Sequence, residues 1–125
     1  MPASPDQIAH ARDLFGDLGD ISTGGMFGGT ALYAEGDVMF ACILGGTIWM
    51  KSDATTRAAY ETAGARPFTY AKAKGDQVVT SLMALPDSAT DDPDEAIEWA
   101  RLSYPPALAA AQKKRREKAR KAARA

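Results

Sequence analysis

Apolar residues near the N-terminus recur at helical spacing. They lie three or four residues apart, an interval that places side chains on one face of an α-helix, and they are Ile8, Ala11, Leu14, Phe15 and Leu18. Ser4 followed by Pro5 supplies a capping hydroxyl and a proline at the first helical position. This pattern predicts a helix from about Pro5 to Leu18.

Short runs rich in β-branched and aromatic residues follow, separated by glycine-containing turns. Such runs are typical of β-strands, and a two-residue turn such as Gly45-Gly46 is typical of a hairpin. A second turn is expected at Lys74-Gly75-Asp76. The predicted strands are Ile21–Phe27, Thr30–Glu35, Val38–Leu44, Thr47–Lys51, Phe68–Ala73 and Gln77–Met83.

Two further helices are expected in the second half of the chain. Ser52 or Asp53 can cap a short helix that ends near Gly64. The acidic run 91–95 contains Pro93 and is a strong helix start. Pro105-Pro106 disfavours helical geometry at the preceding residue, so we expect a break or kink there. The helix would restart at Pro106, run to Ala111 and fade into the tail.

The order of elements indicates the fold class. Helix, about four strands, helix, two strands and helix, with short hairpins between strands, favour an α+β two-layer sandwich. Its antiparallel sheet would have about five to six strands with flanking helices. The length of 125 residues fits a single domain. We place this domain at residues 1–112 and a basic tail at residues 113–125.

The strand Val38–Leu44 is apolar throughout. Strict alternation would place Val38, Phe40, Cys42 and Leu44 on one face and the three intervening residues on the other. Helices cover only one face of a two-layer sheet, and an exposed apolar patch usually marks an interface. The second face therefore calls for a cover, for which a homodimer and a C-terminal helix folded over the sheet are the two candidates.

Charge divides the chain unevenly. Residues 1–112 hold seven basic and 15 acidic side chains, a balance of −8, whereas residues 113–125 hold eight basic side chains and Glu117, a balance of +7. A cationic cluster of this kind can neutralise several phosphates and bind nucleic acid independently of sequence. The alternative is a solvated tail that aids solubility or pairs with the acidic body. The candidate nucleic-acid-binding residues are Lys113, Lys114, Arg115, Arg116, Lys118, Arg120, Lys121 and Arg124.

Groups that run reactions or bind metals are scarce. The chain has one histidine, His10, and one cysteine, Cys42, which lies within an apolar run; zinc sites need three or four ligands. The glycine-rich stretch 24–29 lacks the lysine and hydroxyl residue that close a P-loop. We therefore expect no catalytic residues, no metal and no cofactor. With no disulfide, signal peptide or membrane span in the pattern, a cytoplasmic location is expected.

Several short motifs follow one another in order between about Asp6 and Ala111, among them Gly64-Ala65-Arg66-Pro67 and Leu85-Pro86. The positions that carry the motifs, to which we assign structural roles, are Met26, Phe27, Gly28, Gly29, Gly36, Phe40, Lys51, Phe68, Tyr70, Pro86 and Trp99. The order and spacing of these motifs resemble the N-terminal domain of the TfoX/Sxy proteins. Longer family members carry a second C-terminal domain, where this chain has its basic tail.

The resemblance implies a regulatory rather than an enzymatic role. TfoX/Sxy proteins regulate competence genes in bacteria, and the family pattern contributes no catalytic residues. The leading hypothesis is thus a homodimeric regulatory domain that acts in transcription control through a protein partner. The alternative is an accessory protein that binds nucleic acid through the basic tail.

Overall fold

The computed structural model describes residues 2–26, 28–72 and 75–124. The predictions made for Phe27, Ala73 and Lys74 lie outside these residues. The elements in chain order are α1 (Pro5–Phe15), the 3₁₀ segment η1 (Gly16–Leu18), β1 (Ile21–Met26), β2 (Gly29–Ala34), β3 (Val38–Leu44), β4 (Thr47–Lys51), α2 (Arg57–Thr62), β5 (Pro67–Lys72), β6 (Gly75–Ala84), the 3₁₀ segment η2 (Asp87–Ala89) and α3 (Pro93–Arg124). The two 3₁₀ segments are additions to the predicted series.

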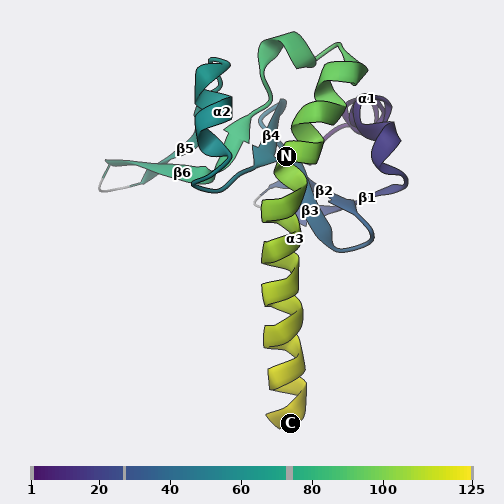
Figure 1. Cartoon of the computed structure of the whole chain (residues 1–125), viewed down its shortest axis with the longest axis vertical. Helices are drawn as coiled ribbons and strands as arrows, with labels where there is room; N and C mark the ends of the chain where they lie inside the picture. Colours follow the sequence, from purple (N-terminus) through teal and green to yellow (C-terminus); the bar gives the residue numbers. More distant parts are fainter. Residues whose placement is uncertain (1, 27, 73–74, 125) are drawn as a thin grey trace.

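The described strands form one antiparallel six-stranded sheet in the spatial order β1-β2-β3-β4-β6-β5 (Figure 1). This confirms the predicted α+β class and the antiparallel pairing. Strand β6 pairs with two strands. Its first half pairs with β5, and Leu82, Met83 and Ala84 pair with β4. The last two strands therefore exchange their places relative to the chain order.

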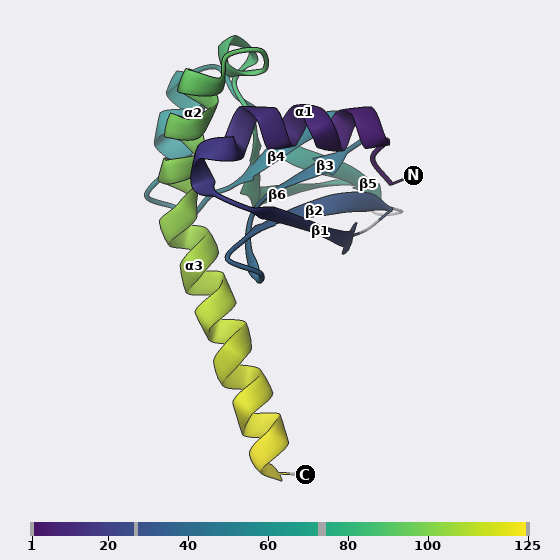
Figure 2. The same cartoon turned by 90° about the vertical axis from the view of Figure 1, so that its right-hand side faces the viewer.

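Helices cover one face of the sheet and enclose the main core (Figure 2). Phe15 of α1 packs edge-on against Phe40 of β3, with ring centroids 5.2 Å apart. Met50 and Met83 on neighbouring central strands are fully buried in the same cluster. Alanines of α3 complete this core, and small side chains of this kind let a helix approach a sheet closely.

A β-bulge changes which side chains of β3 face this core. Leu32 pairs with Ala41 and Tyr33 pairs with Met39, so Phe40 has no partner on β2. An unpaired extra residue shifts the alternation of the strand by one position. Val38, Phe40, Ala41 and Ile43 consequently all belong to the main core, whereas Cys42 does not. The strict alternation predicted for Val38–Leu44 is therefore wrong beyond Phe40.

The second face of the sheet carries a small apolar cluster of its own. Cys42, Trp49, Leu82 and Ala84 are buried there, each no more than 6% exposed, within the single chain. Phe68 of β5 packs edge-on against Trp49 at 5.1 Å between centroids. The C-terminal helix is not the cover, because its buried residues belong to the main core together with α1. That part of the prediction is wrong, and side chains of the sheet itself supply the cover.

The starts of α1 and α3 follow the local sequence, and that of α2 does not. The Ser4 hydroxyl accepts a hydrogen bond from the Gln7 amide at 3.1 Å, and the Gln7 side chain accepts one from the Ser4 amide at 2.8 Å, which is a capping box. At α2 the predicted cap at Ser52 or Asp53 is wrong: Asp53 accepts hydrogen bonds from the amides of Thr55 and Thr56 in the preceding turn, and the N-cap is Thr56, which makes no side-chain cap hydrogen bond. Asp92 accepts hydrogen bonds from the amides of Asp94 and Glu95 at the start of α3.

The predicted break at Pro105-Pro106 does not occur. Helix α3 continues through both prolines and extends to Arg124. Packing on both sides of the prolines outweighs the local cost of about 3 kcal/mol per proline in a helix interior. Ser103 and Ala107 are buried against the body, and Ser103 shares a buried hydrogen bond with the hydroxyl of Tyr60 on α2. The helix is held at the point where its own backbone bonding is weakest.

Candidate functional site

The basic residues at the C-terminus form the exposed end of α3. Buried positions of this helix end at Ala111, and residues 112–124 are all exposed. At 1.5 Å per residue this exposed part is about 20 Å long, and it projects away from the sheet (Figures 1 and 2). The tail predicted from the sequence is therefore a continuation of a core helix.

Two acidic residues of the turn between β2 and β3 hold the base of this projection. Arg115 donates two hydrogen bonds to Asp37, from Nε to Oδ2 at 2.7 Å and from the guanidinium to Oδ1 at 2.5 Å. This bidentate bond lowers the pKa of Asp37 and raises the pKa of Arg115. About three turns earlier on α3, the Tyr104 hydroxyl donates a hydrogen bond to the carboxylate of Glu35, which raises the pKa of the Tyr104 hydroxyl.

Six of the seven remaining cations divide into an inner and an outer set, and Lys121 lies beside Arg120 and Arg124 near the tip of the helix. Lys114 lies close enough to the half-buried Lys51 to help lower its pKa, after the larger effect of burial, and Lys118 helps lower the pKa of Asp37. These two side chains and Arg115 thus face the body. A second set follows at intervals of three, four and four residues, which places its members along one strip of the helix. This outer strip consists of Lys113, Arg116, Arg120 and Arg124.

The positions quoted for the family resemblance lie in the framework. Phe40 is in the core, Gly28 and Gly36 have φ angles of 80° and 87°, and Pro86 is buried before η2. A Cβ atom on Gly29 would come within 2.4 Å of the Ile43 carbonyl oxygen, so the position requires glycine. The remaining described positions lie on strands or on α3 and are Met26, Lys51, Phe68, Tyr70 and Trp99. Phe27 lies outside the described residues.

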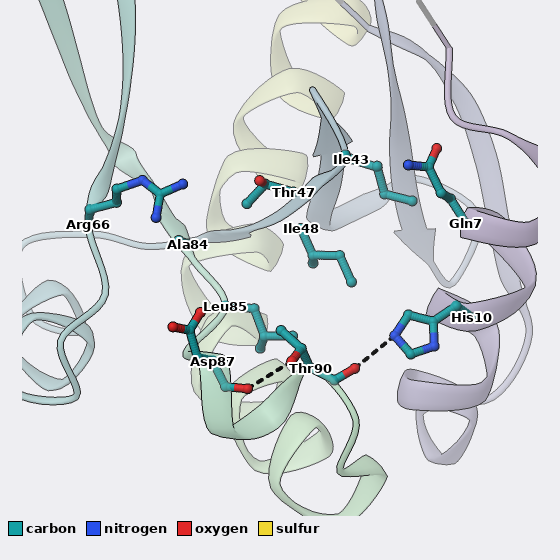
Figure 3. Close-up of a pocket in the computed structure, with 11 residues that line it drawn as sticks. Gln7, His10, Ile43, Thr47, Ile48, Arg66, Ala84, Leu85, Asp87 and Thr90 are labelled. Carbon is teal, nitrogen blue, oxygen red and sulfur yellow. Dashed lines mark hydrogen bonds between the residues drawn. The ribbon is translucent and has the colours of Figure 1, made fainter.

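A pocket of about 230 Å³ opens beside the β3–β4 turn (Figure 3). It is formed by α1, the β3–β4 hairpin, the segment before β5 and the segment from the end of β6 to Thr90. Ile43, Ile48 and Leu85 form its apolar floor, and Arg66 and Asp87 bring opposite charges to it. His10 closes one side: its Nε2 lies 2.7 Å from the Thr90 carbonyl oxygen, and because that oxygen only accepts, Nε2 is the protonated nitrogen.

Comparison with known protein families shows to which family the body of the chain belongs. The TfoX N-terminal domain matches residues 13–107, which is more than half of the chain. The chain belongs to the TfoX N-terminal domain family. This match confirms the resemblance found in the sequence. The fold described above is therefore the fold of a TfoX domain. The match ends before the exposed part of α3. A search of curated proteins found no match.

Residues of a nucleophilic or metal site do not come together in the described part of the TfoX domain. Cys42 lies in the cluster on the second face of the sheet, whereas His10 lies on α1 over the first. Burial raises the pKa of the Cys42 thiol to about 11, so the thiol is neutral at pH 7. Among the described residues no three His, Cys, Asp or Glu side chains gather into a metal-binding group. No helix in the described ranges has the apolar length needed to span a membrane.

Sequence reasoning missed the anchoring acids and the pocket. Glu35 and Asp37 stand in a short turn, where charge is ordinary, and only the fold brings Asp37 next to a residue 78 positions away. The pocket residues come from segments as far apart as Gln7 and Thr90. The family motif includes Arg66, but nothing in the local sequence indicates that its side chain lines a pocket.

Proposed function

We propose that this TfoX domain is a non-enzymatic regulator that binds duplex DNA through the outer strip of α3. The observation that supports this most is the helical, fully exposed state of residues 112–124, because it presents the cations on a rigid rod. The family relationship supports a role in transcription control, and competence genes are the first targets to examine.

The charge distribution favours contact through the projecting helix alone. Residues 1–112 carry a balance of −8, and an acidic surface repels phosphates. The exposed end of α3 holds the positive charge about 20 Å from that surface at its tip. Phosphate contacts of this kind position a protein on DNA but do not read the bases.

The salt dependence of binding follows from the number of contacts. Each neutralised phosphate contributes about −0.9 to the slope of log K against log salt concentration. The four residues of the outer strip therefore predict a slope of about −3.6, which is an affinity loss of roughly 150-fold between 50 and 200 mM salt. Fluorescence anisotropy with a labelled duplex of random sequence measures this slope.

Two double variants with the same loss of charge test the geometry. We expect Arg116→Gln/Arg120→Gln, on the outer strip, to reduce the slope by about 1.8. The control Lys114→Gln/Lys118→Gln removes two inner cations and should reduce it by less than half as much. Equal effects of the two pairs would reject the outer strip, and unchanged binding after truncation at Gln112 would reject the role of the helix altogether.

A non-enzymatic role is supported by the separation of His10 from Cys42 and by the neutral state of the thiol. The homodimer and the protein partner stay predictions from the sequence. The apolar cluster that prompted the homodimer is buried within one chain, so the DNA-binding role has the better structural support.

A further inference from the structure

The pocket beside the β3–β4 turn carries two opposite charges that do not neutralise each other. Within the described residues the guanidinium of Arg66 forms no ion pair and donates no hydrogen bond, and the carboxylate of Asp87 forms no ion pair and accepts no hydrogen bond. Figure 3 shows both side chains on the same side of the pocket, Arg66 above and Asp87 below. The space between them is open to a ligand that carries both charges.

The guanidinium of Arg66 is positioned by an aromatic ring. It lies over the Trp49 ring, 5.5 Å from the centroid, a stacking that leaves its N–H donors free at the edge of the guanidinium plane. Trp49 is itself fixed, because its Nε1 donates a hydrogen bond to the Leu44 carbonyl at 3.3 Å and its ring packs against Phe68. A guanidinium held in this way suits a carboxylate, which it binds through two parallel hydrogen bonds.

The floor of the pocket is apolar and its volume is small. Ile48 and Leu85 are central in Figure 3, with Ile43 toward Gln7. A volume of about 230 Å³ is below the range typical of drug-sized ligands, roughly 300–1,000 Å³. It suits a molecule of about ten non-hydrogen atoms with one apolar group.

We propose that this pocket binds a free α-amino acid with an apolar side chain. Arg66 would bind the carboxylate, Asp87 would bind the ammonium group, and the side chain would rest on Ile48 and Leu85. A simple carboxylate would meet the negative charge of Asp87, and a simple amine would meet the positive charge of Arg66. A zwitterion pairs its carboxylate with Arg66 and its ammonium group with Asp87. The pocket should therefore prefer zwitterions to simple carboxylates and to simple amines.

Titration of the full chain with L-leucine and L-phenylalanine tests this assignment. Binding is followed by calorimetry and by the amide resonances of Gly46 and Leu85, which report on the pocket directly. We expect both amino acids to bind, and glycine to bind at least tenfold more weakly. 4-Methylpentanoate and 3-methylbutylamine, which each retain one charge of leucine, should also bind at least tenfold more weakly. Equal binding of either analogue would overturn the zwitterion assignment.

Charge-neutralising variants test the two charged residues. Arg66→Gln and Asp87→Asn should each weaken leucine binding tenfold or more, whereas Arg101→Gln, on the exposed side of α3, should not change it. Circular dichroism and the unfolding midpoint verify that each variant is folded. If Arg66→Gln unfolds the domain, Asp87→Asn and the analogue series still decide the question. Absence of binding by any amino acid at 10 mM, or full binding by the folded variants, would reject the proposal.

Discussion

The buried pair formed by Tyr60 and Ser103 connects α2 to the middle of α3, and its removal has a predictable energetic effect. Tyr60 is fully buried, and its hydroxyl contacts both the Ser103 hydroxyl and the Trp99 carbonyl oxygen, the latter at 3.3 Å. Burial raises the pKa of this phenol, so it stays neutral. Replacement by phenylalanine keeps the ring in the core and removes only these two hydrogen bonds.

The expected loss of unfolding free energy can be worked from those bonds. Each contributes about 0.5–1.5 kcal/mol, so Tyr60→Phe should cost about 2 kcal/mol. An unfolding entropy of about 2.1 cal/mol/K per residue converts this to a decrease in Tm of about 8 °C for a chain of this length. Urea unfolding measures the free energy directly, and an unchanged m value shows that the denatured state is unaffected.

A double-mutant cycle separates the pair from its surroundings. Ser103→Ala alone should cost about 1–2 kcal/mol because it leaves the Tyr60 hydroxyl with one partner. Tyr60→Phe/Ser103→Ala should cost about 1 kcal/mol less than the sum of the two single variants. The control is Tyr33→Phe, because Tyr33 is partly buried and its hydroxyl makes no hydrogen bond among the described residues; this variant should stay within about 0.5 kcal/mol of the parent. Additive losses, or a loss below 0.5 kcal/mol for Tyr60→Phe, would refute the reasoning.

Three further predictions concern other parts of the domain. Burial raises the pKa of Cys42 from 9.0 to about 11, so the neutral thiol contributes its full stabilisation below pH 9, and we expect the free energy of unfolding to fall by about 2–3 kcal/mol as the pH rises to 11. Urea unfolding at pH 8 and pH 11 should show a smaller fall for Cys42→Ala than for the parent chain, and an equal fall would contradict this. Gly29→Ala would bring a Cβ within 2.4 Å of the Ile43 carbonyl oxygen and should destabilise the fold by about 2 kcal/mol or more, whereas Gly25→Ala, where nothing lies within 4 Å, should cost less than 1 kcal/mol; similar thermal midpoints for the two variants would argue against the close approach. Asp37→Asn should release Arg115 for phosphate contact and steepen the salt slope of DNA binding by about 0.9, and an unchanged slope would show that Arg115 does not become available.

Local features of this chain were predictable from sequence, and features that depend on distant contacts were not. The hydroxyl of Ser4, the proline after it and the apolar spacing that follows all act within one or two turns, and the first helix starts where they indicate. The hairpin at Gly45-Gly46 is equally local, because both residues have positive φ angles. The order and spacing of the motifs also sufficed to predict the family.

The bulge at Phe40 and the continuous α3 depend on the rest of the fold. The bulge arises from the pairing between β2 and β3, and no residue type marks it in the sequence. At Pro105-Pro106 the local preference for a break is real, but the packing of Ser103 and Ala107 overrides it. The pocket is assembled from four separate segments, so neither its charges nor its floor form a pattern along the chain.

The unbroken course of α3 has a consequence for how its exposed end behaves. Starting a helix in water is unfavourable, whereas adding a residue to an existing one is not. The half of α3 that packs in the core therefore serves as a permanent template for the half outside. Thermal fraying should begin at the last turn near Arg124 and proceed inward one residue at a time. Any force that a bound molecule exerts on the tip is therefore transmitted along α3 to the core side chains that its first half contacts.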